Sequence, residues 1–143
     1  MTMHILGLDH VVLRVQEMNR VMRFYRDVLG CSVERVRDDL GLVQLRAGQS
    51  LIDLVAVDGE IGRKGGRAPG TKGHNMDHLC LRIEPFDQAA LTAHLIGHGV
   101  LPGEVGMRYG ADGFGQSVYI SDPEGNVVEL KGPPDSGYRE RPA

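Results

Sequence analysis

The sequence predicts an α+β fold of two tandem modules, each built from a strand, a helix and three further strands (βαβββ). The main observation is a repeat: residues 8–15 are LDHVVLRV and residues 76–83 are MDHLCLRI, with Asp, His, Leu and Arg at matching places. His10 and His78 are 68 residues apart (78 − 10), close to half of the 143-residue chain. A glycine-rich stretch separates the two copies. We therefore interpret residues 5–131 as one domain with duplicated halves.

Composition and charge exclude several classes of protein. The net charge of −3 and the pI of about 6.0 give no basic surface for nucleic acid. No apolar run approaches the roughly 20 residues of a membrane span. The N-terminus lacks the basic and apolar regions of a secretory signal. Cys31 and Cys80 lie far apart without metal-site spacing, which is typical of free thiols in a reducing cytosol. We expect a cytoplasmic protein.

The first module is predicted over residues 5–57. Residues 5–15 are rich in β-branched side chains and predict a strand, in which alternation puts His10, Val12 and Arg14 on one face. The opposite face is apolar and suits a covering helix, so the face with His10 is expected to line a cavity. Apolar spacing predicts that helix over 19–29, ended by Gly30. The remaining strands are predicted over 32–37, 41–46 and 50–57, the last two as a hairpin.

Residues 58–75 are expected to form a flexible linker between the modules. They contain six glycines and four basic residues. The order of strand, glycine loop, Gly-Lys-Ser/Thr and helix that a phosphate-binding loop needs is absent. The basic residues therefore predict no nucleotide site.

The second module is predicted over residues 76–131 with the same plan. A strand over 76–83 is followed by a helix that starts after Phe86 and ends near Ile96. Residues 101–116 hold five glycines, and the loop with Arg108, Tyr109, Gly110 and Gly113 is a candidate mobile lid. Strands are predicted over 117–121 and 126–131, with a turn between them. The tail, 132–143, is expected to be poorly ordered or laid over a neighbour.

The last strand of each module carries a lone acid, which predicts a metal site. Asp53 stands in SLIDL and Glu129 stands in NVVEL, and a carboxylate on a buried strand is costly unless it is paired or metal-bound. One His or one acid on a strand is more often structural. If the modules pack about a pseudo-twofold axis, however, His10, Asp53, His78 and Glu129 converge. Two imidazoles and two carboxylates suit a divalent Zn, Ni, Mn, Co or Fe(II) ion. The side chain of Asp53 is one methylene shorter than that of glutamate. Asp53 is therefore expected to reach the metal either directly or only through a water molecule.

Four segments make the sequence similar to the vicinal oxygen chelate superfamily, which includes glyoxalase I, bleomycin-resistance proteins and extradiol dioxygenases. They are 8–15 (LDHVVLRV), 24–30 (FYRDVLG), 77–78 (DH) and 121–130 (SDPEGNVVEL). The resemblance covers residues 5–131. It implies two βαβββ modules in an open mixed-sheet barrel around a metal, a small-molecule substrate and a homodimer. The site could form within one chain or across a module-swapped dimer.

The resemblance to glyoxalase I implies a specific chemistry and a set of roles. There, the metal holds the vicinal oxygens of a hemithioacetal and stabilises an enediolate, so Glu129 would be both metal ligand and general base. The spacing from His10 to Arg14 matches glyoxalase I, where that Arg contacts a carboxylate of glutathione. The other candidate substrate-binding residues are Arg82, Arg108 and Tyr119. The leading interpretation is an enzyme most like lactoylglutathione lyase, although Asp53 departs from the usual glutamate.

Two alternatives remain open. Extradiol dioxygenases use two His and one Glu on Fe(II), which fits if Asp53 is too short to bind. The run 118–125 resembles their signature, but a histidine expected upstream is replaced by residues 110–112, GAD. Non-catalytic drug-binding proteins of the superfamily have lost the metal ligands. The presence of His10, His78 and Glu129 argues against this last class.

Overall fold

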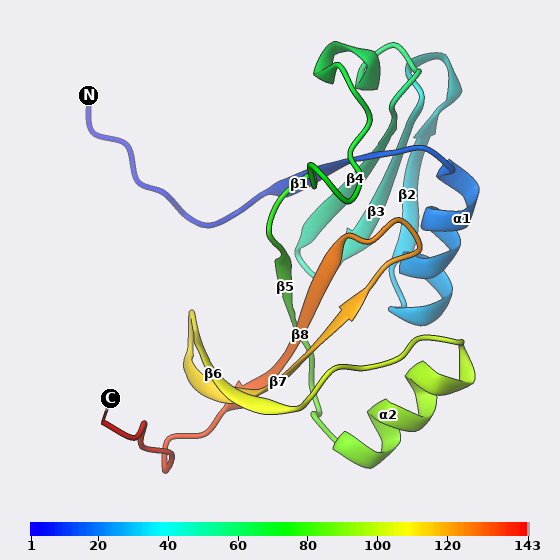
Figure 1. The fold of residues 1–143 in the computed structure, drawn as a ribbon. Coiled ribbons are helices and arrows are strands. Elements are labelled where there is room, and N and C mark those ends of the chain that lie inside the picture. Colours follow the sequence, from blue (N-terminus) through cyan, green and yellow to red (C-terminus); the bar gives the residue numbers. More distant parts are fainter. Residues whose placement is uncertain (143) are drawn as a thin grey trace. The chain divides into compact units, whose positions relative to one another are not determined.

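Each half of the chain folds into a four-stranded mixed sheet with one main helix (Figure 1). The structure is a computed structural model that describes residues 1–142. It divides into two compact units: residues 1–75 with Pro123–Gly125, and the rest from Met76 onward. The turn at 123–125 belongs to the first unit, where the Glu124 carboxylate accepts hydrogen bonds from the backbone N–H groups of Gln16 and Glu17.

The first unit has the strand order β1-β4-β3-β2, with β1 and β4 parallel and the other pairs antiparallel. Its helix α1 contacts β3 and β4. Its elements are β1 (His10–Val15), α1 (Met18–Arg23), η1 (Phe24–Val28), β2 (Ser32–Arg37), η2 (Asp38–Leu40), β3 (Leu42–Ala47), β4 (Ser50–Ala56) and η3 (Gly62–Gly65).

The second unit has the equivalent order β5-β8-β7-β6, again with its first and last strands parallel. The α+β class and the repeated βαβββ plan are therefore confirmed. Its elements are β5 (Leu79–Arg82), α2 (Gln88–Gly97), β6 (Gly106–Gly110), β7 (Gly113–Ser121) and β8 (Val127–Pro134). None of the helices within residues 1–142 has the length and apolar character needed to cross a membrane.

The alternation of β1 decides which of its faces is buried. Leu13 and Val15 are completely buried, whereas His10 and Val12 are exposed. Burying an aliphatic side chain contributes roughly 1.5–3 kcal/mol, so the apolar face fixes the strand's orientation and turns His10 the other way. The cores of the two units consist of fully or almost fully buried aliphatic and aromatic side chains. These include Val21, Tyr25, Leu45 and Leu54 in the first, and Leu95, Val118, Val128 and Leu130 in the second.

Both first strands are shorter than predicted. β1 starts at His10 and not at residue 5, and β5 starts at Leu79 and not at residue 76. The partner strand limits each: His10 pairs with Leu51 near the start of β4, and Leu79 pairs with Val128 near the start of β8. Residues before His10 form an extended arm that leaves its sheet (Figure 1).

The predicted helix over 19–29 is interrupted. α1 ends at Arg23 and continues as a π-helical turn over Phe24–Val28. In this turn the Leu29 N–H donates to the Phe24 carbonyl, five residues earlier. The adjacent rings of Phe24 and Tyr25 are both buried and meet edge to face, with centroids 5.1 Å apart. Two adjacent aromatic side chains are therefore buried in this turn, where a regular α-helix would bury residues three or four positions apart.

The second glycine-rich stretch is a hairpin, not a lid without secondary structure. Residues 106–110 are β6, and β7 begins at Gly113. Backbone pairing needs no side chain, so glycines with low strand propensity are tolerated here. Likewise, β8 continues through Pro134, so the predicted tail begins inside a strand. The first glycine-rich stretch contains the short helix η3.

A buried turn fixes the start of β8. The Asp122 carboxylate accepts hydrogen bonds from the backbone N–H and the side-chain amide of Asn126, both at 2.9 Å. Both side chains are buried. Gly125 lies between them at φ 84°, a conformation that favours glycine. Because the acid Glu129 follows three residues later, this turn sets its position.

We predict that Asp122→Ala lowers the free energy of unfolding by about 2 kcal/mol, because two buried donors lose their acceptor. Urea unfolding followed by circular dichroism measures the change. Asp135→Ala is the matched control, since the exposed Asp135 carboxylate accepts from the backbone of Gly137. The control is expected to change stability by less than about 0.5 kcal/mol. Equal losses in both variants would contradict the prediction.

Candidate functional site

The predicted ligands hold the same strand positions in both units. His10 lies two residues before Val12, which pairs with Asp53 across β1 and β4. His78 lies two residues before Cys80, which pairs with Glu129 across β5 and β8. Because strand side chains alternate, a step of two residues keeps each His on the same face as its acid.

In the first unit, His10 and Asp53 form an acid–imidazole pair. The His10 Nε2 atom lies 4.0 Å from Asp53 Oδ2, and His10 Nδ1 lies 2.7 Å from Asp9 Oδ1. The hydrogen bond to Asp9 and the charge of Asp53 raise the pKa of His10. A neutral ring that donates from Nδ1 to Asp9 presents the Nε2 lone pair toward Asp53.

Asp53 is only 5% exposed, and its two oxygens differ. Oδ2 accepts a hydrogen bond from Gln44 Nε2 at 3.1 Å. Oδ1 is buried and has no hydrogen-bond partner among the described residues. Burying a carboxylate oxygen without a partner is costly, so this oxygen is available as a ligand for a cation.

The second unit has a tighter pair. His78 Nε2 lies 3.3 Å from Glu129 Oε1, and His78 Nδ1 lies 2.5 Å from Asp77 Oδ1. Glu129 is 6% exposed. The ring of Tyr119 meets the His78 ring edge to face, with centroids 5.3 Å apart. Pairing and packing therefore hold both His78 and Glu129 in place.

Asp9 and Asp77 have a role that the sequence interpretation missed. Each carboxylate contacts the Nδ1 atom of the histidine that follows it. Metal-binding histidines usually donate their second ring N–H to a carboxylate or carbonyl, which fixes the tautomer and the ring orientation. The repeated Asp-His dipeptide was the available signal.

The structure brings the four predicted ligands together as two pairs, one in each unit. Residues 1–142 contain no group of three or more His, Cys, Asp or Glu side chains close enough to hold a metal ion. Each pair offers one imidazole nitrogen and one carboxylate, donors that suit a divalent transition metal.

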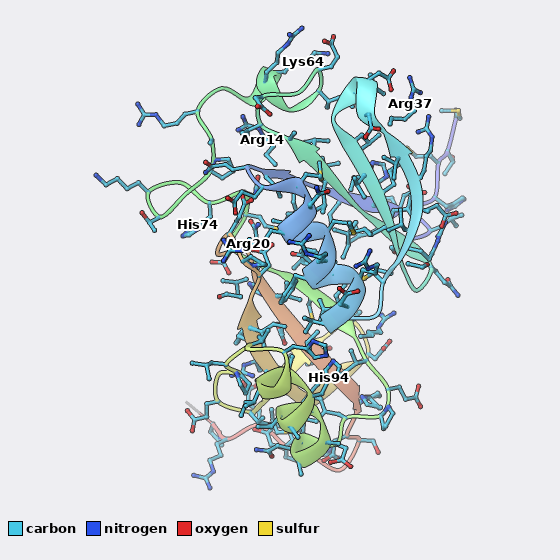
Figure 2. All side chains as sticks on the ribbon, turned by 90° about the vertical axis from the view of Figure 1, so that its right-hand side faces the viewer. Arg14, Arg20, Arg37, Lys64, His74 and His94 are labelled. Carbon is cyan, nitrogen blue, oxygen red and sulfur yellow. The ribbon has the colours of Figure 1, made fainter. Side chains whose placement is uncertain are left out.

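Arg14, a predicted substrate-binding residue, is enclosed by the first glycine-rich stretch (Figure 2). Its guanidinium donates to the carbonyls of Gly62, Gly65, Gly66 and Arg67 at 2.7–3.2 Å. A Cβ atom on Gly65 would lie 2.4 Å from Arg14 Nε, so a larger residue there would displace the guanidinium. These contacts give Arg14 a structural role, and its contact with a substrate stays a prediction.

The other candidate substrate-binding residues all lie in the second unit. The Arg82 Nε atom lies 2.8 Å from an oxygen of Asp112 at the tip of the β6–β7 hairpin. Arg108 stacks over Tyr119, 4.6 Å from the ring centre, and donates to the carbonyl and hydroxyl of Ser117. Arg108 and Tyr119 thus lie beside His78 and Glu129, whereas Arg82 is paired at the rim.

Two further groups near Glu129 are perturbed by it. Partial burial, and then the Glu129 charge, raise the pKa of the Cys80 thiol to about 11. The same causes raise the pKa of Tyr119. Without a metal, Cys80 therefore stays protonated at neutral pH and is a poor nucleophile.

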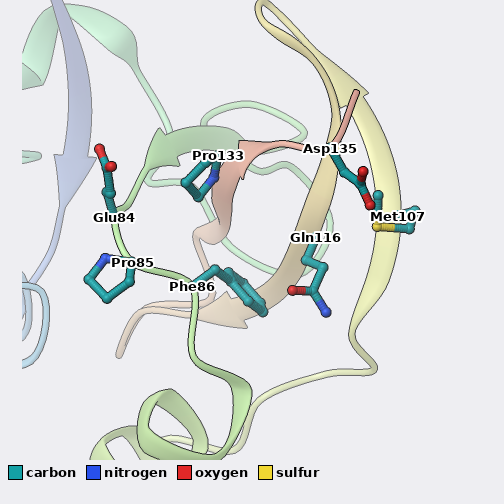
Figure 3. Close-up of a pocket in the computed structure, with 7 residues that line it drawn as sticks. All are labelled: Glu84, Pro85, Phe86, Met107, Gln116, Pro133 and Asp135. Carbon is teal, nitrogen blue, oxygen red and sulfur yellow. The ribbon is translucent and has the colours of Figure 1, made fainter. Parts of the chain in front are cut away.

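A separate pocket of about 540 Å³ in the second unit contains none of the predicted ligands (Figure 3). Met107, which lines it, is the neighbour of Arg108 in β6 and points to the opposite face of the strand. The pocket is lined by Glu84, Pro85, Phe86, Met107, Gln116, Pro133 and Asp135.

Comparison with known proteins gives a consistent picture. Residues 7–130 match the family model of the glyoxalase/bleomycin resistance protein/dioxygenase superfamily. The chain is 31% identical over 124 residues to virulence protein STM3117 of Salmonella typhimurium, covering 86% of this chain and 81% of that protein.

Solved structures with this fold include an integron cassette protein, VCH_CASS1, from the mobile metagenome of V. cholerae. It has a TM-score of 0.76 and 27% identity, over 92% of this chain and 98% of that one. Lactoylglutathione lyase from Agrobacterium tumefaciens has a TM-score of 0.62 and 21% identity, over 93% and 98%. At that identity the likeness concerns the fold alone.

We predict that Arg14→Met speeds tryptic cleavage after Lys64 and Arg67 several-fold, because the loop carbonyls lose the cation that holds them. Limited proteolysis followed by mass spectrometry measures the rate. Arg20→Met is the matched control, since Arg20 makes only an exposed ion pair with Glu17. Unchanged cleavage in Arg14→Met would show that the loop does not depend on this side chain.

Proposed function

Because the chain belongs to the glyoxalase/bleomycin resistance protein/dioxygenase superfamily, we propose that it is a divalent-metal-dependent enzyme. Its metal ligands are His10, Asp53, His78 and Glu129. The observation that carries the proposal is the identical His and acid register in the two units. Duplication alone would copy such a register. What supports a metal site is that both copies keep an almost fully buried carboxylate beside an imidazole, which is costly for a purely structural pair.

The donor set fits such an ion. Asp53 Oδ1 is a buried oxygen that accepts no hydrogen bond from the part of the chain that the structure describes. Asp9 and Asp77 bind the Nδ1 atoms of His10 and His78, so each Nε2, which faces its acid, is the ring atom that would ligate. Zn, Ni, Mn, Co and Fe(II) all accept this mixture of nitrogen and oxygen ligands. The four ligands come from one chain or from two copies of it.

The proposed reaction is of the lactoylglutathione lyase type, on a small substrate with adjacent oxygens. A bound metal supplies Lewis acidity to such oxygens. Glu129 accepts and returns the substrate proton, and its low exposure favours proton transfer away from bulk water. Tyr119 and Arg108 contact the substrate from β7 and β6. We further propose a homodimer, because members of this superfamily often form dimers. We also propose a cytoplasmic location, because the two cysteines are free thiols.

An Fe(II) extradiol dioxygenase is the second candidate, favoured by the geometry of Asp53. Its Oδ2 atom is held by Gln44 and lies 4.0 Å from His10, whereas the equivalent distance from Glu129 to His78 is 3.3 Å. If Asp53 does not ligate, two histidines and Glu129 remain, which is the ligand set of a non-haem Fe(II) site.

We predict that the metal-repleted protein binds about one metal ion per chain, and that His78→Ala lowers the affinity more than the roughly 10–100-fold typical of outer partners. Mass spectrometry of the metal content measures this. His74→Ala, an exposed loop histidine, is the control and should bind as the wild type does. Turnover of methylglyoxal with glutathione supports the lyase, and oxygen uptake on catechols with Fe(II) supports the dioxygenase. If the metal-repleted wild type holds no metal, and the His10→Ala variant binds small molecules as well as the wild type does, the protein is a binding protein and not an enzyme.

We predict that Asp53→Asn weakens metal binding but leaves the metal-free protein as stable as the wild type, or more stable. The amide removes the uncompensated charge of a buried carboxylate while keeping its shape. Thermal unfolding with and without EDTA separates the two effects. If Asp53 is purely structural, the substitution changes stability in both conditions equally and leaves metal affinity intact.

A further inference from the structure

The second sheet carries two cations next to Glu129 that have no acidic partner. Lys131 lies two residues after Glu129 in β8 and therefore on the same face, where it pairs across the sheet with Ser117. Arg108 donates to the carbonyl and hydroxyl of that same Ser117. Among the described residues, neither cation lies within ion-pair distance of a carboxylate.

Lys131 is unusual because its side chain is only 6% exposed and yet its ammonium group has few hydrogen-bond partners. Its Nζ atom donates to the Gly113 carbonyl at 2.9 Å, and its other two N–H groups have no partner among residues 1–142. A buried ammonium without a counter-charge is costly. Lys131 therefore favours binding of an anion that the described residues do not supply.

Glycines make the room for this lysine. A Cβ atom on Gly110 would lie 2.9 Å from Lys131 Cε, and one on Gly115 would lie 3.1 Å from Nζ. The β6–β7 hairpin that the sequence led us to interpret as a lid is therefore a slot around the lysine side chain. Arg108, which pairs with Gly115, stands at its edge.

The first unit lacks all of this at equivalent positions. There, Asp53 takes the place of Glu129, and the residue two positions later is the buried Val55. Its cross-strand partner is the buried Leu42, where the second sheet has Ser117. The two halves thus share the acid and the histidine, but only the second carries the cations.

We propose that Lys131 and Arg108 form a binding subsite for an anionic group, a carboxylate or a phosphate, on the substrate. As a claim about the substrate this rests on the proposed function: the substrate carries an anionic arm in addition to its vicinal oxygens. Arg108 is held by Ser117 and by the Tyr119 ring, and part of its guanidinium edge is still unused. Hydrogen bonds between two charged groups are the strong ones, so both cations contribute to affinity.

The competing explanation is that Lys131 only fastens the hairpin through the Gly113 carbonyl, as the Arg82 pair with Asp112 does at the tip. If Lys131 only holds the hairpin, Lys131→Met lowers the stability of the protein and leaves its affinity for anions unchanged. A subsite predicts loss of anion binding that Arg108→Gln reproduces, although Arg108 does not touch Gly113.

The test is calorimetric titration of the full-length protein in EDTA with inorganic phosphate and, separately, with malonate. We expect wild type and Lys72→Met, an exposed-lysine control, to bind the preferred anion equally. Lys131→Met and Arg108→Gln should each bind about tenfold more weakly, the loss expected when one charged hydrogen bond of roughly 1.5 kcal/mol is removed. The anion that wild type prefers identifies the source of the charge.

Two results would overturn the subsite: wild type binds neither anion, or both variants bind as wild type does. If Lys131→Met fails to fold, Arg108→Gln alone decides. His78→Ala should keep its affinity for the anion in EDTA, since this binding needs no metal. If the wild-type protein binds no metal ion but still binds the anion in a Lys131-dependent way, the proposed function is refuted and the subsite stands.

Discussion

Parallel pairing between the first and last strands of each module is the constraint on which the candidate site depends. β1 pairs with β4 and β5 pairs with β8, and in both pairs the histidine and the acid meet on one face. A slip of one residue in either register would move the acid to the opposite face, into the aliphatic core. Leu13 and Val15 prevent such a slip in the first unit because they are completely buried. Hydrophobic burial therefore fixes the strand register, and the register places the histidine and the acid on the same face of each sheet.

The burial of an acid on the last strand of each module is unfavourable for the stability of the fold. Asp53 and Glu129 are almost fully buried, and one oxygen of Asp53 has no hydrogen-bond partner within residues 1–142. An aliphatic residue at either position would suit the strand better, since buried ion pairs are often no more stable than apolar replacements. Local conflicts of this kind concentrate at functional sites. Their presence at equivalent positions of both units is the physical reason for the proposal that the pairs bind a ligand.

The sequence predicted the parts of the molecule that depend on local pattern. The repeat, the alternation in β1 and the isolated acids are all visible within a few residues, and so the βαβββ plan and the two His–acid pairs could be inferred. The contacts of Arg14 and Lys131 could not. Arg14 binds carbonyls 48–53 residues away, and Lys131 is buried by a hairpin that glycines allow to approach it. Glycine has little strand propensity, so β6 was interpreted as part of a lid. These contacts arise from chain folding and leave no periodic signal.

Duplication and divergence together explain why the two units differ. Both keep a histidine and an acid at equivalent positions. The arginines Arg14 and Arg82 also hold equivalent positions, and both are engaged: one by loop carbonyls, the other by Asp112. Beyond these shared positions, the first sheet has Val55 and Leu42 where the second has Lys131 and Ser117. An aliphatic pair and a cationic pair favour different parts of a small molecule. Under the proposed function, the anionic end of the substrate is therefore expected at Lys131 and Arg108 of the second unit.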